Sequence, residues 1–234
     1  MKDKIRLSLL CLALIATILL VGLNITTVRV TGNHMYTAEQ LEEIIFPDHF
    51  SRNSTVCALR ELMGKKKSIP FVQDYKLAFT GPTSVELIVY EKSIVGYVSY
   101  MSSKMYFDKD GIIVESSGRK LDGIPEITGL HFGQIVLYQK LPVENDRIFS
   151  MILNLTQALS SYGIAADVIR YDSSLNASMT AGDVTILLGS DSEMNGKLSE
   201  LSNILPEIRD LSGTLDLSDF DPTVTNRMYS FKKR

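Results

Sequence analysis

The sequence is poor in cysteine and histidine, and neither sign of charge dominates any long region. Its 234 residues include two cysteines, and Cys11 lies inside an apolar run near the N-terminus. No intramolecular disulfide is therefore expected, and Cys57 is interpreted as a small core residue on a helix. A chain of this length can bury enough apolar surface without such bonds. The 24 basic and 27 acidic residues give a net charge of -3, which argues against a nucleic-acid partner.

Motifs typical of enzymes are also missing. The three histidines, His34, His49 and His131, show no metal-binding spacing such as H-E-x-x-H and are interpreted as turn or surface residues. There is no G-x-S-x-G elbow, and no Ser-x-x-Lys accompanied by the other motifs of penicillin-binding enzymes. We therefore expect no catalytic residue, no metal, no cofactor and no small-molecule substrate.

Two groups of carboxylates are candidates for metal sites. Asp108-x-Asp110-Gly111 resembles the start of a calcium loop, but its twelfth position is Arg119 where a carboxylate is needed. A tight turn is the favoured interpretation. A second group, Asp216, Asp219 and Asp221, is interpreted as solvated turn carboxylates rather than as a metal site.

What the sequence does contain is an uncharged apolar run over residues 7–23. As a helix it would be about 25 Å long, close to the thickness of the hydrocarbon core of a bilayer. Basic residues dominate the six-residue tail that precedes it, which favours a cytoplasmic N-terminus. We expect residues 7–25 to span the cell membrane once, with the bulk of the chain extracytoplasmic. A cleaved signal peptide is the alternative.

Residues 26–92 have the pattern of a small two-layer domain. A strand over 26–31 precedes a helix that begins at the capping box Thr37-x-x-Gln40. A second helix is expected from residue 53 or 54 to Met63, and alternating strands follow at 72–79 and 85–90. The buried face of that second helix is assigned to its large apolar residues, namely Val56, Leu59, Leu62 and Met63.

Residues 93–234 predict a second α+β domain of strand hairpins with two helices. The hairpin turn at Asp110-Gly111 and apolar stripes over 145–162 and 191–208 support this organisation. A late strand is expected at 213–217, and residues 227–232 could pair with it.

Several of these segments resemble the FtsQ/DivIB family of bacterial cell-division proteins. They match its opening strand and Gly-Asn turn, its Pro-x-Val, its closing strand before Glu-Lys, its Leu-Pro helix and its late Asp-Leu strand; the matching residues are 28–33, 70–72, 85–92, 196–208 and 213–217. The β-α-α-β-β order of residues 26–92 similarly resembles a POTRA domain. The fold class expected from the resemblance is α+β: a transmembrane helix, a POTRA-like domain and a C-terminal domain of the FtsQ/DivIB type.

The resemblance implies a bitopic, non-catalytic scaffold of the division septum. Such a protein binds divisome membrane proteins of the FtsB/DivIC and FtsL type and couples septum formation to cell-wall synthesis. Partner contacts would lie on the late strands and around them, and the candidate residues are Leu215, Asp216, Leu217, Phe220 and Tyr229. A closing hairpin with its apolar side chains turned inward is the alternative interpretation of these residues. For the whole protein, the alternatives are a POTRA-bearing protein-transport component and a membrane-anchored cell-wall enzyme.

Overall fold

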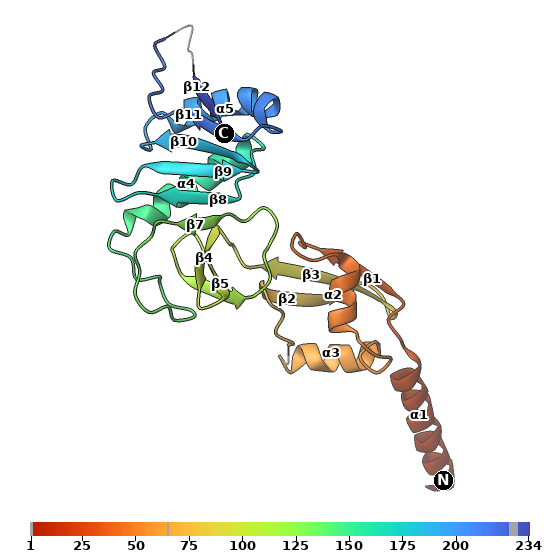
Figure 1. The fold of residues 1–234 in the computed structure, drawn as a ribbon. Helices are drawn as coiled ribbons and strands as arrows, with labels where there is room; N and C mark the ends of the chain where they lie inside the picture. Colours follow the sequence, from red (N-terminus) through yellow and green to blue (C-terminus); the bar gives the residue numbers. More distant parts are fainter. Residues whose placement is uncertain (1, 65, 225–228) are drawn as a thin grey trace. The chain divides into compact units, whose positions relative to one another are not determined.

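The structure is a computed structural model that describes residues 2–64, 66–224 and 229–234 (Figure 1). Its class is α+β, as expected. The chain divides into two compact units, Met1–Lys92 and Ser93–Arg234.

The first unit contains a three-stranded sheet and two short helices after an N-terminal helix. In chain order its elements are α1 (Lys2–Gly22), β1 (Thr27–Thr31), α2 (Ala38–Ile45), α3 (Ser54–Leu62), β2 (Val72–Phe79) and β3 (Ser84–Glu91). The sheet has the order β1-β3-β2, with β1 parallel to β3 and β2 antiparallel to it. Val85, Leu87 and Val89 of β3 are buried, which confirms the face predicted from their alternation.

Both short helices begin at capping residues, and the capping box of α2 is the one predicted from the sequence. At α2, the Thr37 hydroxyl accepts from the Gln40 N–H at 3.3 Å and the Gln40 side chain accepts from the Thr37 N–H at 3.0 Å. At α3, the Asn53 side chain accepts from the N–H groups of Thr55 and Val56, each at 3.1 Å. These bonds satisfy backbone donors that have no partner within the helix.

The predicted buried face of α3 is wrong. Leu59, Leu62 and Met63 are 54%, 85% and 53% exposed, while Ser54 and Cys57 face the interior. The Ser54 hydroxyl donates to the Pro82 carbonyl at 2.7 Å, and the Cys57 thiol donates to the Ser51 carbonyl at 2.7 Å. The Ser54 bond joins α3 to the turn before β3, and Cys57 packs with Ile25, Phe46 and Val85, so this face of the helix lies inward.

The predicted membrane-spanning segment is also wrong. Among the described residues, no helix has the length and apolar character needed to cross a membrane. Of the expected span, residues 7–22 are helical, a length of about 24 Å against a hydrocarbon core of about 30 Å. Ile25 instead lies in the core of the first unit, 2% exposed, and its N–H donates to the Arg52 carbonyl at 2.7 Å. A single-pass anchor with a cytoplasmic N-terminus is therefore not supported.

The second unit is built on a nine-stranded sheet. Its strands are β4 (Gly96–Tyr100), β5 (Ser103–Phe107), β6 (Ile113–Ser117), β7 (Glu126–Thr128), β8 (Val168–Tyr171), β9 (Ala177–Ala181), β10 (Val184–Gly189), β11 (Gly213–Asp216) and β12 (Ser230–Lys233). Their order among the described residues is β12-β11-β10-β9-β8-β7-β4-β5-β6. The β4–β5, β5–β6, β8–β9, β9–β10 and β11–β12 pairs are antiparallel, and the β4–β7, β7–β8 and β10–β11 pairs are parallel.

Two helices, α4 (Arg147–Ser161) and α5 (Met194–Ile208), share one apolar core with these strands. The stripe predicted for α4 is buried at Ile148, Met151, Ile152, Leu155 and Leu159. On α5, Leu198 and Leu201 have no exposed surface. This packing fixes the strands β10 and β11, and through them the edge strand β12.

Candidate partner-binding edge of the second sheet

The last two strands form the edge of the nine-stranded sheet where partner contacts were predicted (Figure 1). β11 lies between β10 and β12, so its own backbone groups have neighbours on both sides. β12 pairs with β11 in the register Asp216↔Ser230, Leu215↔Phe231, Thr214↔Lys232 and Gly213↔Lys233. Among the described residues β12 is therefore one edge strand of this sheet, with its second side unpaired, and β6 is the other edge strand.

The direction of the backbone groups on β12 follows from one hydrogen bond. The Arg234 N–H donates to the Ser212 carbonyl at 3.0 Å, on the side of β11. Because backbone groups alternate in direction along a strand, Ser230 and Lys232 also face β11. Phe231 and Lys233 then direct their N–H and C=O groups away from the sheet, where a further strand could pair with them.

The two predicted leucines lie beneath this edge rather than on it. Leu215 and Leu217 are each 1% exposed and belong to the core shared with α4 and α5. They position the strand and have no surface for a partner. Their burial fits the alternative interpretation, a closing hairpin with its apolar side chains turned inward.

Asp216 points to the opposite face of the sheet and is partly exposed. Its carboxylate accepts from the Ser218 hydroxyl at 2.6 Å and the Ser218 N–H at 3.0 Å. The Ser218 hydroxyl and N–H, together with the charge of Lys232, hold the pKa of Asp216 below its usual value. The carboxylate is consequently ionised at neutral pH beside a cation of β12.

Phe220 and Tyr229 are partly buried. Phe220 packs on the first turn of α5, because a Cβ atom on Gly196 would lie 2.5 Å from its ring. Tyr229 immediately precedes β12 and packs against the main core. The chain between them includes residues 225–228, so the expected strand residues Arg227 and Met228 lie outside the described residues.

A buried lysine behind this edge was not predicted. Lys197 of α5 is 1% exposed, and its ammonium donates to the carbonyls of Leu188 at 2.7 Å and Ser190 at 3.0 Å. Burial lowers its pKa. Its position on the stripe 194, 197, 198, 201 was the signal that could have placed it inside. It ties α5 to the end of β10, the neighbour of β11.

Exposed cations accompany the edge. Lys232 and Lys233 lie on β12, and Arg234 follows them; all three are exposed. Lys232 faces the same side as Thr214, its partner in the register. The edge therefore combines unpaired backbone groups with positive charge, which suits an extended segment that carries carboxylates.

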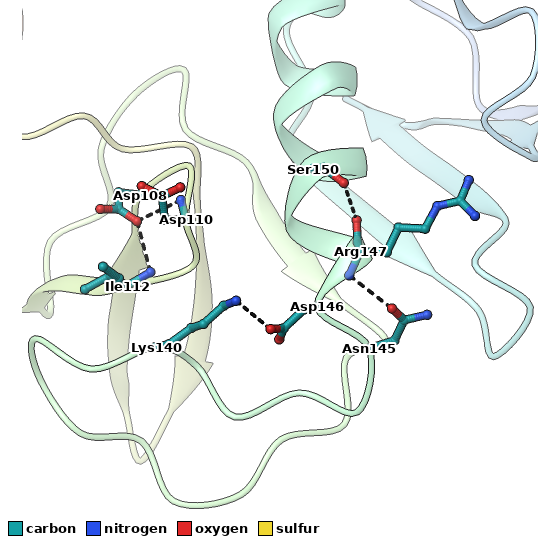
Figure 2. A network of polar contacts seen from close by, with 8 residues as sticks. All are labelled: Asp108, Asp110, Ile112, Lys140, Asn145, Asp146, Arg147 and Ser150. Carbon is teal, nitrogen blue, oxygen red and sulfur yellow. Dashed lines mark hydrogen bonds and ion pairs between the residues drawn. The ribbon is translucent and has the colours of Figure 1, made fainter.

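The carboxylates considered as metal sites take part in turns. Figure 2 shows the Asp108 carboxylate accepting from the N–H groups of Asp110 at 3.0 Å and Ile112 at 2.9 Å. In the same view the Lys140 ammonium meets the Asp146 carboxylate at 2.6 Å. Asp221 accepts from the N–H and hydroxyl of Thr223 at 2.8 and 2.7 Å. No cluster of three His, Cys, Asp or Glu side chains suited to a metal occurs in the described part of the chain.

Hydrogen bonds of Asn145 and Ser150 stabilise the N-terminus of α4. The Asn145 side chain accepts from the Arg147 N–H at 3.0 Å, and the Ser150 hydroxyl donates to the Arg147 carbonyl at 2.7 Å (Figure 2). The predicted surface histidines, His34, His49 and His131, are all exposed.

Comparison with known proteins gives no assignment. No protein-family model matches the chain, and no curated protein matches it. The geometry of the sheet edge is therefore the basis for a functional proposal.

Proposed function

We propose that this protein is a non-catalytic scaffold that binds partner proteins by adding a partner strand to β12. Following the family resemblance of the sequence, the partners would be divisome proteins of the FtsB/DivIC and FtsL type. Binding them would couple septum formation to cell-wall synthesis. The observation that carries the proposal is the unpaired outer side of β12.

The chemistry of the edge supports this mode of recognition. Backbone groups of Phe231 and Lys233 supply hydrogen bonds to an added strand, and these bonds give affinity without requiring a pocket. The charges of Lys232 and Lys233 favour a partner strand that carries carboxylates and would speed its association at low salt. The buried leucines Leu215 and Leu217 keep the template rigid, so little ordering is required on binding.

A proline on the outer side of β12 tests the proposal. Lys233→Pro removes an outward N–H and places the proline ring where an added strand would lie, while the inward N–H of Arg234 remains. Lys233→Ala is the matched control, because it removes the same side chain and keeps the N–H. Affinity of the full chain for the partner ectodomains is measured by titration calorimetry.

We expect Lys233→Pro to weaken binding roughly tenfold or more, the effect of about one lost hydrogen bond with added steric exclusion. Lys233→Ala should stay within roughly threefold, since an exposed rim charge contributes little. Equal binding by the proline variant would place the contact elsewhere. Failure of the unmodified chain to bind either partner would reject the divisome assignment itself.

A further inference from the structure

An apolar stripe lies on the solvent side of α3. Leu59, Leu62 and Met63 are spaced as i, i+3 and i+4, which places them on one face of the helix. All three are more than half exposed, and Leu62 reaches 85%. An exposed leucine alone needs no explanation, but three together on one helical face mark a surface that contacts something apolar.

The turn before α3 extends this surface. Phe50 is 65% exposed, and the Arg60 guanidinium lies 5.8 Å from the centre of its ring. That contact places Phe50 beside Arg60 of the helix. We refer to Phe50, Leu59, Leu62 and Met63 as the α3 apolar surface.

The charge around this surface differs from that of the whole protein. Residues 48–67 contain five basic residues, Arg52, Arg60, Lys65, Lys66 and Lys67, against the two acidic residues Asp48 and Glu61. With Glu42 and Asp74, the carboxylates that pair with Arg52 and Lys66, the net charge of this region is +1, whereas the complete chain carries -3. An apolar face rimmed by cations is the pattern of a helix that lies at the surface of an anionic bilayer.

The cations keep exposed surface despite their contacts within the protein. Lys66 pairs with Asp74 at 2.7 Å, and Lys67 donates to the Ile44 carbonyl at 2.9 Å. Arg52 pairs with Glu42 at 2.8 Å. Arg60, Lys66 and Lys67 are nevertheless exposed, so their charge acts on the surrounding solvent and on any surface brought close.

We infer that α3 and its preceding turn dock peripherally on an anionic lipid surface. The apolar surface would enter the boundary between headgroups and acyl chains, and the cations would meet the lipid phosphates. The alternative occupant is a second copy of the chain. A two-fold interface through α3 would bring Arg60 and Lys67 of both copies together, and this repulsion favours the anionic lipid.

The complete absence of tryptophan allows a direct test on the full chain. Leu62→Trp places a single fluorophore on the α3 apolar surface, and Tyr138→Trp places one at a 70% exposed aromatic position of the second unit. Each variant is mixed with vesicles of phosphatidylglycerol and phosphatidylcholine that contain brominated acyl chains, and with vesicles of phosphatidylcholine alone. Bromine quenches a tryptophan only where that residue enters the bilayer.

We expect the Leu62→Trp variant to lose emission with the anionic vesicles, and the Tyr138→Trp variant to lose none. Arg60→Gln combined with Lys67→Gln should weaken this binding roughly 25-fold, because each cation removed should weaken it about fivefold. Leu62→Glu should abolish the contact of α3, whereas Met101→Glu, at an 82% exposed position, should not. Because these side chains are exposed, circular dichroism should show unchanged folding.

Three results would overturn the inference. One is no quenching of the Leu62→Trp variant with anionic vesicles, and another is equal quenching of the Leu62→Trp and Tyr138→Trp variants. The third is blue-shifted emission of the Leu62→Trp variant in the absence of lipid. Sedimentation equilibrium would then show what covers the α3 apolar surface instead. A dimer that Leu62→Glu dissociates would indicate a second copy, and a monomer would indicate coverage by the chain itself.

Discussion

Lys197 is the buried polar side chain with the greatest consequence for the proposed binding edge. Its ammonium satisfies the carbonyls of Leu188 and Ser190, at the point where the chain leaves β10 for α5. Taking the charge out of water is unfavourable, and the lowered pKa expresses this cost. Leaving two carbonyls without a donor is also unfavourable, by about 1–3 kcal/mol for a buried group.

We expect Lys197→Met to destabilise the second unit by about 1–2 kcal/mol at pH 7, because the lost hydrogen bonds outweigh the relief of desolvation. A lysine with a lowered pKa in the folded state loses its proton there first, so the native protein gains stability as pH rises from that pKa towards the unfolded value. The methionine variant has no such gain. The difference in free energy of unfolding between the native protein and this variant, measured by urea denaturation, should therefore be larger at about pH 10, near the ordinary pKa of lysine, than at pH 7.

The exposed lysine Lys120 provides the control, since Lys120→Met should change stability little at either pH. A Lys197→Met protein as stable as the native one would show that the carbonyls find other donors.

At the scale of elements, local signals in the sequence predicted much of the fold. Alternation identified the hairpin of β2 and β3, and the capping box at Thr37 identified the start of α2. These features depend on neighbours in the chain, which a sequence displays directly. The strand β9 was missed although its short sequence, ASMTA, alternates, because two of its three apolar residues are alanines, which are weak strand formers.

Orientation could not be predicted in the same way. The apolar stripe of α3 indicated an inward face, yet the opposite face packs inward through Cys57 in the core cluster and the bond of Ser54 to the Pro82 carbonyl. The late strands were likewise placed correctly as a pair, but periodicity could not show that Leu215 would lie under the edge and Phe231 on the outermost strand. Which face of a helix or strand lies inward depends on contacts with residues distant in the sequence, and periodicity alone does not show these contacts.

The cap of α3 can be tested at this scale. Asn53→Ala removes the acceptor for the N–H groups of Thr55 and Val56 and should destabilise the first unit by about 1 kcal/mol. Asn53→Asp keeps an acceptor near the positive end of the helix and should recover most of that loss. Thermal unfolding followed by circular dichroism measures both; equal losses would mean that the side-chain oxygen is not the stabilising group.

At the scale of the whole molecule, the cores are separate. The core cluster that contains Ile186 is formed by residues of the second unit, whereas Leu87 belongs to a cluster formed by residues of the first. Cooperative unfolding follows from shared burial. Because none of these core clusters has members from both units, two unfolding transitions are expected rather than one.

We expect Leu87→Ala to lower the melting temperature of one calorimetric transition and leave the other unchanged. The side chain has no exposed surface, so its truncation should remove about 3 kcal/mol from the first unit. Ile186→Ala, equally buried in the second unit, should shift only the other transition. Because β12 belongs to the second unit, strand addition by a partner should raise only the transition that Ile186→Ala lowers. A joint shift of both transitions by either substitution would show that the units unfold as one.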